Sequence, residues 1–95
     1  MESTGLKFES TERRHRATHN GTEVAHADVD PIGADAVLIK HTEVSPSMEG
    51  KGVGGALIRH ILEGVRAQGK TVIPICPFAK SYIQRHPEYQ DLVRR

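Results

Sequence analysis

The first half of the chain alternates apolar and polar residues with the short period of β-strands. The alternation is weak in Leu6–Arg14, clearer in Glu23–Val29, and strongest in Ala36–Val44. The dipeptide Asn20-Gly21 is a strong signal for a two-residue hairpin turn, and Asp30–Gly33 is a turn by composition. This half of the sequence therefore predicts an antiparallel meander of three strands.

Apolar residues in the second half recur every three or four positions, which is the period of an α-helix. They run from Val53 to Val65 and predict an amphipathic helix that ends at Gly69. Gly64 lies inside this helix, where glycine costs about 1 kcal/mol relative to alanine. We therefore expect Gly64 to pack closely against the sheet.

A short strand and a second helix complete the predicted elements. Thr71–Ile75 is short and apolar and predicts a buried strand. Proline is common at the first position of a helix, so Pro77 predicts a helix start, and Phe78–Arg85 is the predicted helix, which Pro87 ends. The strand–helix–strand crossover makes Thr71–Ile75 parallel to the strand before the helix. The predicted fold class is α+β, or mixed α/β: an antiparallel β-meander, a glycine loop, a helix, a parallel strand and a short C-terminal helix.

Composition and charge exclude several classes of protein. The 95 residues predict a single domain over residues 6–95, preceded by a small, polar, flexible tail over residues 1–5. The net charge of +1 argues against nucleic acid or a membrane surface as a partner. The single cysteine rules out an internal disulfide framework, and no apolar run approaches the roughly 20 residues of a membrane span. Because the first residues have no apolar signal region, we expect a cytoplasmic protein.

The glycine-rich segment Glu49–Gly55 is the candidate ligand site. Glycine tolerates positive φ, so backbone N–H groups can turn inward, and the following helix adds unpaired N–H donors with a partial positive charge. Together these features favour a phosphate or pyrophosphate, and the alternative is a tight turn without a ligand. A dinucleotide fingerprint would need an acidic residue at the end of the next strand, but this chain has Ile75–Pro77 there. The sequence also contains no Walker A run, so neither nucleotide-binding motif is supported.

The same residues resemble a known family. Glu49–Gly54 resembles motif A of the GNAT acetyltransferase superfamily, Gln/Arg-x-x-Gly-x-Gly/Ala, with Glu49 at the position that is usually Gln or Arg. Together with His41–Val44, Ile75–Phe78 and His86–Tyr89, this segment looks like the minimal Yjdj-type GNAT-like subfamily over nearly all of the chain. That subfamily keeps the acetyl-CoA half of the fold and lacks most of the C-terminal strands. The resemblance implies a truncated GNAT-like fold with acetyl-CoA or CoA as the cofactor.

The resemblance also implies where that cofactor binds. In the family, the pantetheine arm runs beside the strand before the glycine loop and bonds to its backbone like an added strand. The implied cofactor-binding residues are Thr42, Glu43, Val44, Glu49, Gly50, Lys51, Gly52, Val53, Gly54 and Gly55. The N–H of Val44 would hold the thioester oxygen, and Lys40 or Arg59 would join Lys51 at the phosphates. Pro74 cannot donate to a strand ladder, so it predicts either a gap that admits the pantetheine or an edge strand.

Three side chains are candidates for catalysis, each with a structural alternative. Cys76, before a helix start, is a candidate nucleophile or an inert buried thiol. His41 is a candidate base for the acceptor amine or a solvent-facing strand residue. Tyr82 stands where many GNAT enzymes carry the tyrosine that protonates the leaving thiolate, or else packs under the sheet. His15 and His19 would lie about 13 Å apart in a strand, and we predict no metal site.

Two functions from different classes follow from the resemblance. The first is an N-acetyltransferase that moves an acetyl group from acetyl-CoA to an unidentified amine on a small molecule or a protein. The second is a CoA-binding or interaction module without efficient transferase activity. His41, Cys76 and Tyr82 together favour the enzyme, whereas the short chain and Glu49 favour the module.

Overall fold

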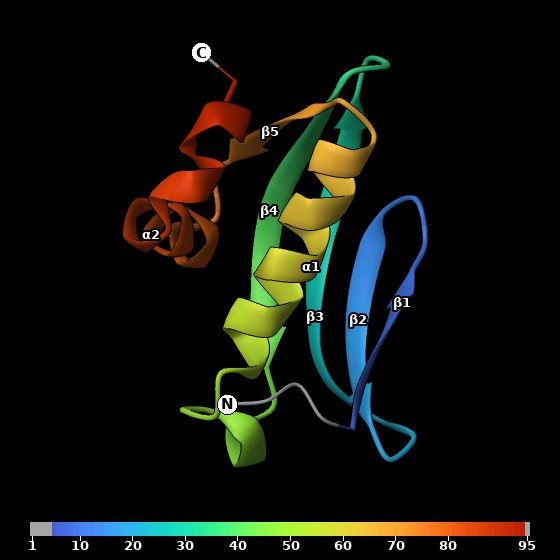
Figure 1. Ribbon diagram of the computed structural model, residues 1–95. Helices are drawn as coiled ribbons and strands as arrows, with labels where there is room; N and C mark the ends of the chain where they lie inside the picture. The colour runs from blue at the N-terminus through green and yellow to red at the C-terminus, as the bar shows by residue number, and fades with distance from the viewer. Residues whose placement is uncertain (1–4, 95) are drawn as a thin grey trace.

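A mixed sheet with one helix across its face forms the body of the protein (Figure 1). The computed structural model describes residues 5–94, so the predicted tail lies outside the described residues except for Gly5. Within this range the elements are β1 (Leu6–Ser10), β2 (Arg14–His19), β3 (Thr22–Ile32), β4 (Ala36–Val44), the 3₁₀ helix η1 (Pro46–Met48), α1 (Val53–Ala67), β5 (Thr71–Pro74), α2 (Pro77–Arg85) and the 3₁₀ helix η2 (Pro87–Leu92).

The strands lie side by side in chain order, β1-β2-β3-β4-β5. The first four are antiparallel, and β5 is parallel to β4 after the crossover through α1. The predicted α+β class and the parallel crossover are therefore confirmed. No helix within residues 5–94 is long and apolar enough to cross a bilayer.

The prediction of three strands in the meander was wrong, because the meander has four. The segment predicted as one strand, Leu6–Arg14, contains β1, a turn and the first residue of β2. Ala17 is the only fully buried residue of β2, and its neighbours are histidines, arginines and a threonine. A strand with this composition carries no hydrophobic alternation. The predicted hairpin at Asn20-Gly21 is confirmed: both residues have positive φ, 51° and 82°, and they join β2 to β3.

The predicted turn at Asp30–Gly33 was also misplaced, because β3 continues through Pro31 to Ile32 and the chain turns at residues 33–35. The N–H of Val29 donates to the carbonyl of Arg13 at 3.0 Å, just before β2 begins. The nitrogen of Pro31, two residues later, points to the same side of β3 as the N–H of Val29, but it lies beyond Arg14, where β2 begins. No N–H is needed at that position, so proline does not interrupt the strand.

Helix α1 covers one face of the sheet with the apolar stripe that its sequence predicts. Its buried apolar side chains are Val53, Leu57, Ile58, Ile61, Leu62 and Val65. Gly69 has a φ of +69° just after the helix, as expected for a glycine that ends a helix. The expected close packing of Gly64 was wrong, because a Cβ atom there would meet nothing within 4 Å outside the helix backbone.

An extra residue in β4 decides which side chains face α1. Asp28 pairs with His41 and Val29 pairs with Ile39, so Lys40 is the unpaired residue of a β-bulge. The bulge bends the strand and shifts its alternation by one position. Thr42 therefore faces the same side of the sheet as Ile39, beneath α1, and His41 faces the opposite side.

Strands β4 and β5 separate soon after they meet. They pair only over Ala36–Ile39 of β4, and the carbonyl of Ile39 accepts the last two bonds, from the N–H groups of Ile75 and Cys76 at 3.1 and 3.2 Å. The chain then turns into α2. Within residues 5–94, no strand pairs with Thr42–Val44 on this side.

The backbone of the separated part of β4 faces this open edge. The N–H of Ser45 donates to Val24 of β3 at 2.8 Å. Because peptide groups alternate in direction along a strand, those of Val44 and Thr42 point away from β3. Their N–H and C=O groups are therefore directed toward the gap between β4 and α2.

Candidate functional site

A cleft of about 590 Å³ lies where the open edge of β4, the glycine loop and α2 meet. The lining residues come from these three elements: Thr42, Val44, Met48, Glu49, Gly50, Gly52, Val53, Gly54, Gly55, Phe78, Tyr82, Arg85 and His86. Eight of the ten predicted cofactor-binding residues are among them. The cleft thus brings together the end of β4 and the glycine loop, the two segments that contain the predicted cofactor-binding residues.

The glycine loop brings the positive end of α1 to the cleft. Gly50 and Gly52 have φ values of +79° and +80°, which side chains other than glycine rarely adopt. The first bond of α1 runs from the N–H of Ala56 to the carbonyl of Gly52 at 3.0 Å. The earlier N–H groups of the helix have no partner inside it, and their residues line the cleft. This arrangement suits an anion.

The other two glycines allow α1 to come close to its neighbours. A Cβ atom on Gly54 would lie 2.7 Å from Phe78 Cζ and 3.0 Å from Val44 Cγ2. A Cβ atom on Gly55 would lie 3.3 Å from Tyr82 Cε2. Glycine thus has two different effects in this segment: it permits the backbone conformation at positions 50 and 52, and it leaves room for neighbouring side chains at position 54 and, less tightly, at position 55.

Helix α2 supplies the opposite wall with Phe78, Tyr82 and Arg85, and His86 follows directly at the end of the helix. Tyr82 is 7% exposed and stacks on His86, with ring centroids 3.9 Å apart and planes inclined by 16°. Burial raises the pKa of Tyr82, so its hydroxyl stays protonated and can donate a proton. Tyr82 was predicted, but Phe78, Arg85 and His86 were missed. Their spacing of three and four residues from Tyr82 is the signal that could have found them.

Cys76 lies behind the cleft. Cys76 is 4% exposed, and its thiol donates a hydrogen bond to Thr42 Oγ1, with Sγ 3.5 Å from that oxygen. Thr42 lines the cleft and Cys76 does not. The thiol therefore contacts the wall of the site from inside the protein.

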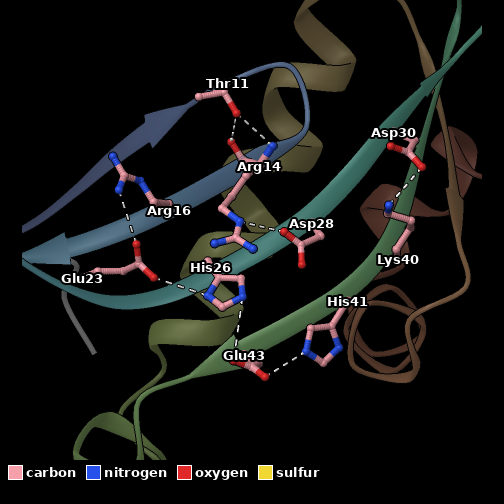
Figure 2. Close-up of polar contacts among 10 residues, drawn as sticks. All are labelled: Thr11, Arg14, Arg16, Glu23, His26, Asp28, Asp30, Lys40, His41 and Glu43. Atoms are coloured by element: carbon pink, nitrogen blue, oxygen red, sulfur yellow. Dashed lines mark hydrogen bonds and ion pairs between the residues drawn. The ribbon is translucent and has the colours of Figure 1, made fainter.

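Three predicted polar residues lie on the far side of the sheet from the cleft (Figure 2). Lys40 is paired with Asp30, with Nζ 3.1 Å from Oδ2. The imidazole of His41 and the carboxylate of Glu43 contact each other, with Nε2 3.2 Å from Oε2. The structure thus places Lys40 away from the glycine loop and the Glu43 side chain away from the cleft.

The two other predicted phosphate contacts also lie outside the cleft. Lys51 is exposed and does not line it. Arg59 lines an adjoining hollow of about 530 Å³, which shares Gly52, Gly55 and Tyr82 with the cleft. No group of three or more His, Cys, Asp or Glu residues among the described residues could hold a metal ion.

Comparisons with known proteins agree with this geometry. Residues 13–92 match the family described as GCN5-related N-acetyl-transferase. No curated protein matches the sequence. A GCN5-like protein from Staphylococcus aureus, solved by NMR, is 25% identical and superposes with a TM-score of 0.75, covering 96% of this chain and 90% of its own.

Two longer proteins share the fold. The ribosomal-protein-S18-alanine N-acetyltransferase of Escherichia coli is 18% identical with a TM-score of 0.67, and the match covers 81% of this chain and 53% of that one. A Mycobacterium tuberculosis protein, Rv2747, solved in complex with CoA, is 24% identical with a TM-score of 0.65, over 79% of this chain and 47% of that one. The present chain thus spans about half the length of these two.

The predicted Yjdj-type subfamily is narrower than these matches and stays a prediction. The broader family is established by the length of the matched segment, which is most of the 95 residues. The separated strands, the glycine loop at the start of a helix and the facing aromatic residues are all contained in it. The chain belongs to the family of GCN5-related N-acetyltransferases.

Proposed function

We propose that this protein binds acetyl-CoA in the cleft and transfers its acetyl group to a primary amine. The observation that carries the proposal is the meeting of an unpaired strand edge and the positive end of a helix in one cleft. Acetyl-CoA is the cosubstrate of the family, and its pantetheine and pyrophosphate require these two kinds of partner.

The order of the elements fixes the direction in which the cofactor would lie. The pyrophosphate accepts hydrogen bonds from the first N–H groups of α1 and from the loop at Gly50 and Gly52. The pantetheine arm then runs along β4 from Val44 toward Thr42, because the glycine loop follows the C-terminal end of that strand. The N–H groups of these two residues donate to the arm and to the thioester oxygen, which becomes negatively charged during transfer.

The transfer is direct. The acceptor enters as an ammonium ion and loses one proton to a base, and its nitrogen then attacks the thioester carbon. A C–N bond forms and the C–S bond breaks. The sulfur of CoA takes a proton from the hydroxyl of Tyr82, which lines the cleft. The nitrogen then gives up its second proton, which restores the Tyr82 hydroxyl, so the products are the acetylated amine, the CoA thiol and one proton on the base. A route through Cys76 is disfavoured because the thiol is buried behind Thr42.

A second candidate function is a CoA-binding module without efficient transfer. Glu49 lines the cleft, so a carboxylate stands beside the place of the pyrophosphate. Like charges repel in a partly desolvated site, and this repulsion lowers affinity for the cofactor.

Single-turnover measurements with a panel of primary amines separate the two functions. The enzyme consumes acetyl-CoA and forms an acetylated amine of matching mass in at least one reaction. The binding module leaves acetyl-CoA intact with every amine while still binding it. Absence of CoA binding by calorimetry would rule out both functions.

A further inference from the structure

The face of the sheet opposite α1 carries a dense set of charged and imidazole side chains from β2, β3 and β4 (Figure 2). Most of them are already paired. Arg14 Nε lies 2.7 Å from Asp28 Oδ1, Arg16 Nη1 lies 3.5 Å from Glu23 Oε1, and Lys40 pairs with Asp30.

One part of this face is different because a single carboxylate, that of Glu43, lies near two imidazoles. Glu43 Oε2 is 3.2 Å from His41 Nε2, and Glu43 Oε1 is 3.8 Å from His26 Nε2. The other nitrogen of His26, Nδ1, is 3.4 Å from Glu23 Oε2. These four residues, Glu23, His26, Glu43 and His41, form a row across β3 and β4, which we call the imidazole row.

The imidazole row ends at the strand edge where the thioester would lie. His41 and Glu43 flank Thr42 in β4, and Thr42 lines the cleft from the other face. The cofactor arm would fill the side toward α1 and α2. The side of the strand that carries His41 would then be left open, and the His41 side chain there is 55% exposed.

The contact with Glu43 also decides which nitrogen of His41 can act as a base. Nε2 faces a carboxylate, which accepts hydrogen bonds and favours a proton on that nitrogen. Nδ1 is left with the lone pair that can take a proton. A carboxylate behind the ring also stabilises the imidazolium ion that forms.

We propose, on the basis of the transferase function above, that the acceptor amine approaches across the imidazole row and that His41 Nδ1 takes the proton from its ammonium group. Glu43 is the positioning residue for His41. In this assignment Glu43 is not a cofactor ligand. His26 Nε2 lies 3.8 Å from the second oxygen of Glu43, beyond hydrogen-bond distance, so His26 is a neighbour of the carboxylate.

Three variants and one control test the assignment by kinetics. His41→Gln is expected to lower kcat by about 100-fold or more, and Glu43→Ala by about tenfold or more, because general-base catalysis contributes about 10²–10⁴-fold. Glu43→Asp restores part of the loss. The control is Glu12→Gln, which removes an exposed carboxylate on the loop between β1 and β2 and leaves kcat unchanged. The affinity for CoA and the KM for acetyl-CoA stay the same in all four variants.

Nitrogen NMR of the imidazoles supplies a readout that does not require activity. The wild-type ring of His41 is expected in the tautomer with the proton on Nε2. Glu43→Ala mixes the two tautomers, and Glu12→Gln does not. Added acetyl-CoA shifts the His41 resonances.

Two results would overturn the assignment of Glu43. A loss of CoA affinity in Glu43→Ala would make Glu43 a cofactor ligand. An unchanged tautomer of His41 in that variant would show that Glu43 does not position the ring. Failure of the proposed function is a separate result. If the wild-type protein binds acetyl-CoA and acetylates no amine, the transferase function fails, while the tautomer measurement still decides whether Glu43 orients His41.

Discussion

At the scale of single residues, two glycines of α1 show how similar sequence positions serve different purposes. Gly54 is enclosed by Phe78 and Val44, with 2.7 and 3.0 Å to the place where its Cβ would be, whereas Gly64 has open space at that place. Both lie inside the same helix.

Gly54→Ala and Gly64→Ala should therefore have opposite effects on stability. The first forces the Phe78 ring to move, destabilises the fold by about 1–3 kcal/mol and lowers CoA affinity, because that ring lines the cleft. The second stabilises the fold by about 0.5–1 kcal/mol, since alanine costs less backbone entropy in a helix. Urea denaturation measures both, with calorimetry for CoA. Equal effects at the two positions would contradict this account.

Tyr82 allows a finer test, because its ring and its hydroxyl have separate tasks. Tyr82→Phe keeps the stack on His86 and removes only the proton donor. We expect kcat for acetyl transfer to fall by about 10- to 100-fold with unchanged CoA affinity. Stopped-flow detection of free CoA thiol measures the step. An unchanged kcat would mean that solvent protonates the leaving thiolate.

At the scale of elements, two histidines contact β1: His60 from α1 and His15 from β2. The ring of His60 stacks on Phe8 with centroids 4.5 Å apart, and Nδ1 of His15 lies 2.7 Å from Ser10 Oγ. Burial lowers the pKa of His15, and the nearby His60 lowers it further. Burial also lowers the pKa of His60.

These shifts predict a loss of stability in mild acid. The folded protein keeps both imidazoles neutral, whereas the unfolded chain binds protons as the pH falls through about 6.5. Unfolding is therefore favoured progressively below that pH. Thermal midpoints measured from pH 7.5 to 5 should fall, and the fall should be smaller in the variant His15→Gln/His60→Gln. Hydrogen exchange should show β1 losing protection before β3. An equal acid sensitivity in the double variant would contradict the assignment.

The same scale shows what sequence patterns can predict. Helix α1 was found from its period because its buried face is apolar, and the glycine loop was found because positive φ favours one residue type. Strand β2 was missed because its inward side chains are His15 and Ala17, which carry no apolar signal. The far-side position of Glu43 was missed because it depends on a bulge, which pairing with β3 creates and local sequence does not reveal.

At the scale of the whole molecule, the cleft joins elements that are far apart in the chain, so a ligand there should hold them together. We expect CoA and acetyl-CoA to stabilise the protein, and NAD and ATP not to. A ligand at 100 times its Kd that binds only the folded state adds about 2.7 kcal/mol, which raises the Tm of a domain this small by about 10 °C or more. Differential scanning fluorimetry measures the shift. An equal shift with NAD would contradict the acetyl-CoA assignment.

The bulge at Lys40 means that β4 is one residue longer than its partner requires. Removing Lys40 would leave a regular ladder, with Ile39 and His41 opposite Val29 and Asp28, and each remaining side chain of β4 would keep its present face. What would be lost is the bend, which occurs just where β5 leaves. A straightened β4 would lack this cause of its separation from β5. Lys40 therefore matters to the cleft through its place in the backbone, because its side chain pairs with Asp30 on the far face of the sheet.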